Sequence, residues 1–285
     1  MQDPLADASR SGSATEDVAD LPWQLRLYRK SLKKRQKVGL LIDQIRELPG
    51  ERRLLITHGD NNGALNYMLR GSGGTWRWME MEPDQVEAIS LLLDDPVLVA
   101  QPRRLLAEDG SFDVVISLDV QEHLDQTDLE QFHAELYRVT APGGHVVTTT
   151  PNGDPWKPVS VLRRAIGMTK EKYGHQVYGY TIAQHERMLR SAGFVPVAAG
   201  SYSGFFTEVI ELGINFAYTT LLSRGKTGRD AGEIAPTTAE RLAKVDKQYR
   251  MYAAAYPILR AISSMDALVP LGDGYAVSVV ARRPG

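Results

Sequence analysis

Apolar positions change their spacing along the chain, and this spacing predicts which segments are strands and which are helices. Short, nearly continuous apolar runs occur at residues 52–57, "RRLLIT", and 112–118, "FDVVISL". Between such runs, apolar residues recur at helical intervals, as Leu129, Phe132 and Leu136 do. Strands that alternate with helices along a chain are typical of a parallel, doubly wound α/β sheet.

The alternation continues through most of the chain. Thr181 is the expected N-cap of one helix, and Gly193 is its expected stop. The stretch "APGG" at residues 141–144 is expected to form a turn. The predicted strands are residues 52–57, 76–82, 97–100, 112–118, 145–151, 195–202 and 274–284, and the predicted helices among them are residues 63–71, 83–93, 127–140 and 181–194.

Three segments lie outside this alternation. Residues 1–20 contain few large apolar side chains and are expected to be a disordered tail. Residues 21–50 are expected to be helical and are rich in basic residues. Residues 206–269 begin with an apolar helix, continue through a stretch expected to be mobile at residues 223–238, and end in helical sequence that Pro257 is expected to interrupt.

The basic residues of the first helical segment gather between residues 26 and 37. We favour a solvated helix face as their explanation. The alternative is a surface that contacts anionic lipid, or a phosphorylated substrate. The basic residues in question are Arg26, Arg29, Lys30, Lys33, Lys34, Arg35 and Lys37.

Composition limits the partners and the cellular compartment that we expect for the protein. The net charge is −2, so the chain has no basic excess of the kind that nucleic-acid-binding proteins carry, and we expect no nucleic-acid partner. The absence of cysteine excludes disulfides, thiolate metal sites and cysteine nucleophiles. The first 20 residues have no secretory signal pattern, and no apolar run reaches the roughly 18 residues that span a bilayer. We therefore expect a cytoplasmic protein, with contact to the inner membrane surface through the basic helix left open.

The stretch "LLITHGDNNGALNYML" at residues 54–69 predicts a strand, a glycine- and asparagine-rich turn and a helix. Such a turn lets the backbone approach a ligand, and the helix N-terminus offers free N–H groups. Glu80 ends the next predicted strand, roughly 20 residues beyond the turn, where an acid can accept from both hydroxyls of a ribose. The alternative is that Glu80 is one of several surface acids, since Glu82 and Asp84 are close by.

Several further motifs follow in a fixed order: "WMEMEP", "GSFDVVISLDVQEHL", "ELYRVTAPGGHVVTTTPN" and "GHQVYGYTIAQHERMLRSAGF". Together with the glycine-bearing turn, they resemble the motifs of class I S-adenosylmethionine-dependent methyltransferases over residues 50–205 and again over residues 270–285. The resemblance implies S-adenosyl-L-methionine as the cofactor and Glu80 as the ribose acid. It implies that the cofactor-binding residues are Gly59, Asp60, Asn61, Gly63, Glu80, Met81, Gln101 and Asp119.

The same resemblance implies a Rossmann-like sheet of seven strands, with the last strand antiparallel and paired to the sixth. Residues 51–205 plus 270–285 would form the methyltransferase domain. Residues 206–269 would be a helical cap inserted before the last strand, shaping the acceptor site or a homodimer interface.

The chain departs from the family pattern at three positions. Thr57 stands where the family usually has an acid, Asn61 replaces the middle glycine, and Gln101 stands where an aspartate often contacts the adenine amino group. Asparagine tolerates left-handed backbone angles, and glutamine still accepts from an amine. Asp60 can supply the missing carboxylate. We therefore expect the altered loop to bind the cofactor.

Methyl transfer to oxygen or nitrogen needs alignment and a proton acceptor. His123, which follows the fourth strand, is our candidate base, with a purely structural role as the alternative. His175 is a second candidate, and Tyr178 and Tyr180 lie in the segment expected to cover the acceptor. We predict no metal. Asp119, Glu122 and His123, whose spacing resembles that of ubiquinone-pathway O-methyltransferases, form a weak alternative metal site.

These observations favour a methyltransferase that acts on a small-molecule, lipid-linked or glycan-linked acceptor. The alternative is a catalytically inactive, methyltransferase-like binding or scaffold protein, which the three departures from the loop pattern motivate. An NAD-dependent dehydrogenase is disfavoured, because the chain has no Tyr-x-x-x-Lys pair after the fourth strand. Nucleic acid as the acceptor has no support, since the chain has "TPNG" in place of an NPPY-like tetrapeptide.

Overall fold

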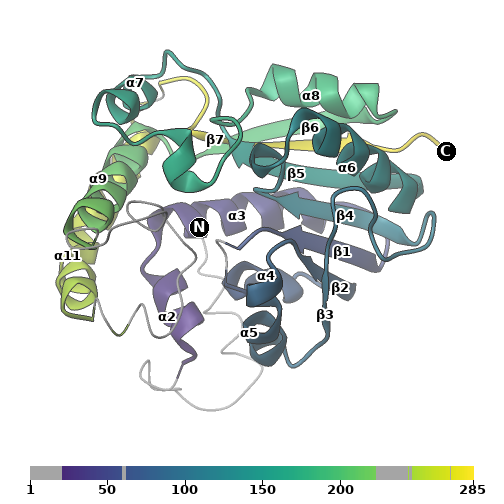
Figure 1. The fold of residues 1–285 in the computed structure, drawn as a ribbon, viewed down its shortest axis with the longest axis horizontal. Coiled ribbons are helices and arrows are strands. Elements are labelled where there is room, and N and C mark those ends of the chain that lie inside the picture. Colours follow the sequence, from purple (N-terminus) through teal and green to yellow (C-terminus); the bar gives the residue numbers. More distant parts are fainter. Residues whose placement is uncertain (1–20, 60–61, 223–242, 244–245, 270) are drawn as a thin grey trace.

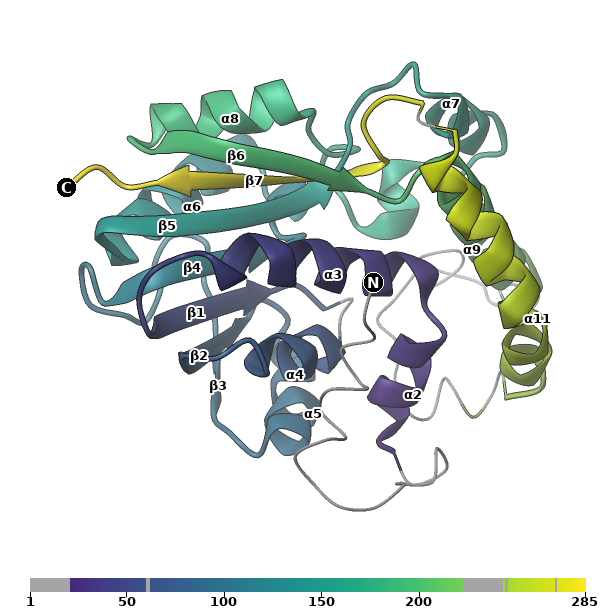
Figure 2. The same ribbon diagram turned by 180° about the vertical axis from the view of Figure 1, so that it is seen from behind.

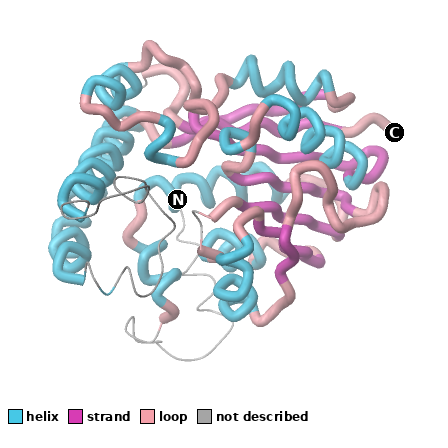
Figure 3. Tube along the Cα trace, in the orientation of Figure 1, coloured by secondary structure: helices cyan, strands magenta, loops and turns pink. Residues whose placement is uncertain are grey.

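A computed structural model describes residues 21–59, 62–222, 243, 246–269 and 271–285. Its centre is one seven-stranded sheet with helices on both faces (Figure 1 and Figure 3). The strand order is β3-β2-β1-β4-β5-β7-β6. The strands are β1 Arg52–Thr57, β2 Thr75–Glu80, β3 Val97–Val99, β4 Phe112–Leu118, β5 Thr140–Pro151, β6 Val195–Tyr202 and β7 Ala276–Arg282.

The last strand alone runs against the others. β1 pairs in parallel with β2 and β4, while β7 lies antiparallel between β5 and β6. Figure 2 shows β6 leading towards the helices at one side of the molecule and β7 returning to the C-terminus. The predicted doubly wound sheet with an antiparallel last strand is confirmed.

Alternate residues of the central strands explain why both faces of the sheet are covered. Leu55 and Ile116 pack into the core on one face, while Leu54 and Val115 pack into the core on the other. Helices α2 Trp23–Arg29, α3 Leu32–Arg46, α4 Ala64–Arg70 and α5 Pro83–Leu93 cover the first face. Helices α6 Gln126–Val139 and α8 Ile182–Ser191 cover the second face.

The remaining helices lie beyond the carboxyl ends of the parallel strands. In the described part of the chain they are the 3₁₀ turn η1 Gln121–His123, α7 Pro158–Ala165, the 3₁₀ turn η2 Lys170–Tyr173, α9 Phe205–Leu222, α11 Asp246–Ser264 and the short η3 Met265–Ala267. Helices α9 and α11 lie side by side in both ribbon views (Figure 1 and Figure 2). We call α9 and α11 the cap. No helix in the described part of the chain is long and apolar enough to cross a membrane.

Local sequence signals place several of these boundaries. Thr181 caps α8 through a reciprocal box with Gln184, and Gly193 follows the helix at φ +100°. The turn expected at residues 141–144 is instead part of β5, where the pairing with β4 jumps from Thr140 to His145. Gly143, at φ +77°, gives the backbone the conformation that such an irregular stretch requires.

Two further expectations concern the cap and the ends. The expected break at Pro257 is wrong, because α11 continues through it. Contacts on the N-terminal side hold that half of the helix: Tyr252 donates to the Lys30 carbonyl, and the Lys30 ammonium lies 4.9 Å from the centre of the Tyr256 ring. The predicted disordered tail at residues 1–20 and the predicted mobile stretch at residues 223–238 lie outside the described residues.

Candidate active site at the carboxyl edge of the sheet

The glycine-bearing loop turns sharply between β1 and α4. Gly59, Asn62 and Gly63 have positive φ values of 31°, 49° and 79°, which glycine and asparagine tolerate best. Gly63 directly precedes α4, and no side chain among the described residues caps that helix, so none of these side chains takes its first N–H groups. Asn62 Oδ1 is buried without a hydrogen-bond partner among the described residues. Asp60 and Asn61 lie outside the described residues.

Glu80 is fixed beside this loop. Its side chain is 1% exposed, and its carboxylate accepts from Thr57 Oγ1 at 2.6 Å, from Gly59 N at 2.8 Å and from Glu82 N at 2.9 Å. Burial raises the pKa of Glu80 above its ordinary value, and the three hydrogen bonds partly offset that rise. Glu80 is therefore an organised part of the loop rather than one of several surface acids. Thr57, the residue in place of the family's usual acid, donates to this carboxylate.

Met81 and Gln101, two further residues expected to bind the cofactor, lie close to Glu80 along the backbone. Met81 donates its N–H to the Thr57 carbonyl at 2.9 Å. The Glu80 carbonyl accepts from Ala100 N at 2.8 Å, which places Gln101 next to the end of β2. Gln101 is exposed and forms an isolated bridge with Arg104. Met81 and Gln101 thus lie at the same edge of the sheet, as the motifs imply.

Asp119 follows β4 and is held by groups from two other segments. The backbone of Asp119 has a φ of +51°. Its carboxylate accepts a hydrogen bond from Thr149 Oγ1 at 2.7 Å and pairs with the Lys37 ammonium. Burial alone would raise the pKa of Asp119, but Lys37 and Thr149 outweigh it, so the pKa lies below its ordinary value. Lys37 is buried, and Lys33 pairs with the buried Glu208 at 3.0 Å. The favoured interpretation of a solvated basic helix face is therefore wrong for these two lysines.

Glu122, His123 and His175 converge beyond the end of β4. One ligand-type atom from each lies within 4.8 Å of the others, an arrangement that can hold a divalent cation or accept protons. The set differs from the weak metal alternative that the sequence suggested, because His175 takes part while Asp119 pairs with Lys37. Burial, followed by the charge of Asp119, raises the pKa of Glu122 well above its ordinary value.

His123 has a defined orientation within this group. Its Nδ1 lies 3.1 Å from the Gly174 carbonyl oxygen, an arrangement in which Nδ1 carries the proton and donates. The lone pair is then on Nε2, which is buried without a hydrogen-bond partner among the described residues. The His175 ring meets the His123 ring edge-on at a centroid distance of 4.6 Å. Burial, followed by the charge of His123, lowers the pKa of His175 to about 3, so His175 is neutral near pH 7.

His58 is a site residue that sequence reasoning missed. Its ring stacks on the His123 ring with a centroid distance of 3.7 Å. This contact brings together the segments that follow β1 and β4. Its Nε2 lies 3.3 Å from Glu82 Oε1. Burial, followed by the charge of His123, lowers the pKa of His58 to about 3, so this contact joins a neutral imidazole to a carboxylate. A titratable residue directly after a buried strand, at the edge where ligands bind, was the signal that could have found it.

The two candidate acceptor-covering tyrosines follow His175 in the chain. Tyr180 donates its N–H to the Pro151 carbonyl at 2.9 Å, which ties this segment to the end of β5. Burial, followed by the charge of Glu122, raises the pKa of the Tyr180 phenol. Tyr178 lines a small notch together with Arg163 of α7.

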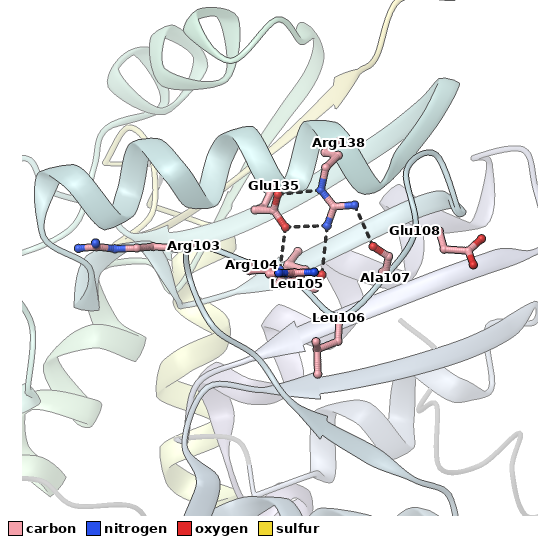
Figure 4. A pocket seen from close by; sticks show the side chains of 8 residues that line it. All are labelled: Arg103, Arg104, Leu105, Leu106, Ala107, Glu108, Glu135 and Arg138. Carbon is pink, nitrogen blue, oxygen red and sulfur yellow. Dashed lines mark hydrogen bonds and ion pairs between the residues drawn. The ribbon is translucent and has the colours of Figure 1, made fainter.

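A larger cavity, of about 680 Å³, lies away from these residues, between α6 and the loop that joins β3 to β4. Figure 4 shows the Arg138 guanidinium within it, bonded to Glu135 and to the carbonyls of Leu105 and Ala107. Arg103 pairs instead with Asp128. These contacts hold the loop in place, and the cavity contains none of the site residues that the motifs indicate.

Comparisons with known proteins concern the domain and its fold. Residues 59–148 match the family model described as "Methyltransferase domain". A putative methyltransferase from Bacillus halodurans C-125 superposes with a TM-score of 0.53 at 15% identity, covering 86% of this chain and 98% of that one. A S-adenosylmethionine-dependent methyltransferase from Archaeoglobus fulgidus gives 0.51 at 15%, covering 92% and 100%.

A third solved structure shows that this fold does not by itself identify the reaction. The [4+2]-cyclase SpnF superposes with a TM-score of 0.53 at 16% identity, covering 99% of this chain and 92% of that one. At such identities the likeness shows the fold and not the reaction. No curated protein matches the sequence.

Proposed function

We propose that this chain, which contains a class I, S-adenosylmethionine-dependent methyltransferase domain, transfers a methyl group to an oxygen or nitrogen of a small-molecule, lipid-linked or glycan-linked acceptor. The observation that carries the proposal is His123 Nε2, which is buried near the end of β4 and has no hydrogen-bond partner among the described residues. In the proposed division, residues 51–205 and 270–285 form the catalytic domain and residues 206–269 belong to its cap.

The residues at the glycine-bearing loop fit the cofactor. Glu80 offers a fixed carboxylate for two hydroxyls, the start of α4 offers N–H groups that no described side chain caps, and Asn62 Oδ1 is a buried acceptor without a donor among the described residues. Lys37 and Asp119 offer opposite charges for the amino and carboxylate groups of the cofactor's methionine end. When bound, the cofactor would supply a methyl group on a positively charged sulfur, and that sulfur would leave as a neutral thioether when the methyl–sulfur bond breaks.

His123 removes the acceptor's proton in the proposed reaction. The Gly174 carbonyl fixes the ring and keeps the proton on Nδ1, so Nε2 remains a proton acceptor. As the acceptor oxygen or nitrogen forms its bond to the methyl carbon, its proton moves to Nε2. His175, neutral and edge-on to His123, forms a wall of the acceptor position and keeps the imidazole in place.

The test compares His123→Gln with a matched variant, His145→Gln. His145 lies in the part of β5 where the strand resumes its pairing with β4, at the opposite end from the site. Radiolabelled S-adenosylmethionine and purified protein are incubated with small-molecule and lipid extracts of cells that express the protein. We expect His123→Gln to slow transfer by about 100-fold or more, with S-adenosylhomocysteine affinity retained, because a general base contributes roughly 10²–10⁴ in rate.

Two outcomes would contradict this proposal. An unchanged rate in His123→Gln would remove the base role, particularly if His145→Gln behaved in the same way. Cofactor binding without transfer of label to any extract would favour a methyltransferase-like binding protein instead.

A further inference from the structure

Helix α11 carries large apolar side chains on the face that points away from the protein. Its inward face packs through tyrosines: Tyr256 is 6% exposed, and Tyr249 and Tyr252 donate to backbone carbonyls of α2 and of the residue that follows it. A surface helix normally carries polar residues on its outer face. The exposed apolar residues of this helix and of the turn after it are Met251 at 66%, Ile258 at 67%, Ile262 at 38%, Met265 at 39% and Leu268 at 80%.

Exposed apolar residues continue onto the neighbouring helices α9 and α7. Val209 and Phe216 of α9 are 38% and 41% exposed, and Val161 and Leu162 of α7 are each 44% exposed. Trp156, just before α7, is 83% exposed. Both ribbon views place α7, α9 and α11 at the same side of the molecule (Figure 1 and Figure 2). We call these five residues and the five of the preceding paragraph the apolar face. Such a gathering of exposed apolar side chains marks a surface that contacts another molecule.

The segments that form and border the apolar face contain basic residues and no acid. Residues 156–170, 212–222 and 247–265 have no aspartate or glutamate. The same is true of residues 21–42, which contact α11 through α2. Lysine and arginine occur seven times in residues 21–42, four times in residues 156–170 and three times in residues 247–265. Because the net charge of the whole chain is −2, this side of the molecule is basic and the remainder is acidic.

Some of these basic side chains are used inside the protein, and others are exposed beside the apolar face. Lys33 and Lys37 pair with buried or largely buried carboxylates. Lys247 and Arg260 of α11 are exposed and form no ion pair within the described part of the chain. Lys247 lies four residues before Met251, on the same stripe of the helix. Long basic side chains next to exposed aliphatic ones can reach lipid phosphates while the aliphatic groups enter the membrane boundary.

The same charges disfavour a second copy of the chain as the occupant of this face. A symmetric dimer places one surface against its own copy. Here that arrangement would bring the basic residues of both copies together, and the segments that form the face offer no acid to pair with them. An anionic bilayer offers both an apolar phase and negative charge.

We propose that the apolar face binds to the surface of a bilayer that contains anionic phospholipid. Met251, Ile258 and Trp156 enter the boundary between headgroups and acyl chains, and Lys247 and Arg260 contact the phosphates. This surface differs from the basic stretch at residues 26–37 in that its apolar side chains, and not only its charges, contact the lipid. The inference concerns where the protein binds, so it does not depend on the methyl-transfer step.

The experiment sediments the full chain with large unilamellar vesicles and measures the bound fraction. One set of vesicles is phosphatidylcholine alone, and the other contains phosphatidylglycerol and phosphatidylcholine at about one to two. Ile258→Ser makes one position of the apolar face polar. Leu91→Ser is the matched control, because Leu91 is 77% exposed on α5, which lies apart from α7, α9 and α11 (Figure 1).

We expect binding to the phosphatidylglycerol vesicles, and binding about tenfold weaker to phosphatidylcholine alone. Ile258→Ser should weaken the binding about tenfold, and Leu91→Ser should leave it unchanged. Lys247→Gln should weaken it about fivefold, since each basic residue near an anionic surface contributes about that factor. His123→Gln should bind the vesicles as the unaltered protein does.

Three outcomes would overturn the inference. The first is that the chain does not sediment with phosphatidylglycerol vesicles, and the second is equal binding of Ile258→Ser and Leu91→Ser. The third is a dimer that Ile258→Ser dissociates, without vesicle binding, which would assign the apolar face to a second copy. If Ile258→Ser fails to fold, Leu268→Ser takes its place, with the same expected loss. Methyl transfer retained without vesicle binding would leave the proposed function standing, and vesicle binding without transfer would leave this inference standing.

Discussion

The two halves of the site are built from contacts of different range. In the cofactor half, Glu80 bonds to Thr57, Gly59 and Glu82, which lie 23, 21 and 2 residues away along the chain. In the acceptor half, Lys33 reaches Glu208 across 175 residues. The Arg163–Glu208 pair in the same half spans 45 residues. The first half is one strand–turn–helix unit and its neighbour, whereas the second exists only once the N-terminal helix and the cap have docked.

The two halves of the site also differ in the groups that satisfy their buried carboxylates. The cofactor half satisfies one carboxylate with uncharged N–H and O–H donors, and the acceptor half is made of buried ion pairs. Removing one member of a buried ion pair leaves a charge without compensation. Damage to the acceptor half should therefore appear as lost stability, while damage to the cofactor half should appear as lost ligand affinity.

The largest expected effect is the loss of stability caused by replacing Glu208. Glu208→Gln leaves Lys33 and Arg163 without their shared carboxylate, and we expect the free energy of unfolding to fall by about 3 kcal/mol. Urea denaturation of the purified variants measures this. Glu171→Gln is the control, because Glu171 is 68% exposed and its ion pair with Lys170 is 4.0 Å long. Equal stability of the two variants would show that the acceptor half does not depend on its buried charges.

Two buried histidines, His185 and His133, lie outside both halves of the site. They show how burial of a titratable side chain makes the stability of the fold depend on pH. His185 is fully buried and neither of its ring nitrogens has a partner among the described residues. Burial lowers the pKa of His185 to about 3 and that of His133 to about 4. The folded state therefore binds fewer protons than the unfolded chain in acid. Stability is complete above the ordinary histidine pKa of about 6.5 and is lost as the pH falls below it.

We expect His185→Leu to remove about 2 kcal/mol of the stability difference between pH 7.5 and pH 5, since one pKa unit corresponds to about 1.4 kcal/mol. Denaturant midpoints measured at both pH values for the unaltered protein and the variant give this number. The same pH dependence in both proteins would mean that His185 does not control acid stability.

The sequence predicted what is local. The strand and helix periods, the cap at Thr181 and the position of Glu80 at the end of β2 each depend on residues within one or two neighbouring elements. The Lys37–Asp119 and Arg163–Glu208 pairs could not be predicted, because nothing in either segment specifies its distant partner. One signal was present: Lys33 and Lys37 stand eight and four residues before Leu41 and thus continue the buried stripe of α3. A lysine on a core-facing stripe needs an acidic partner from another segment.

The central claim is that the altered loop is a working cofactor site anchored by Glu80. Calorimetric titration with S-adenosylhomocysteine tests it most directly, using Glu80→Gln, with Glu82→Gln as the neighbouring control. Replacing the carboxylate by an amide of the same size removes a charged acceptor for two hydroxyls. We predict micromolar binding to the unaltered protein and to Glu82→Gln, and binding about tenfold weaker to Glu80→Gln. Equal affinity of Glu80→Gln and the unaltered protein would contradict the account.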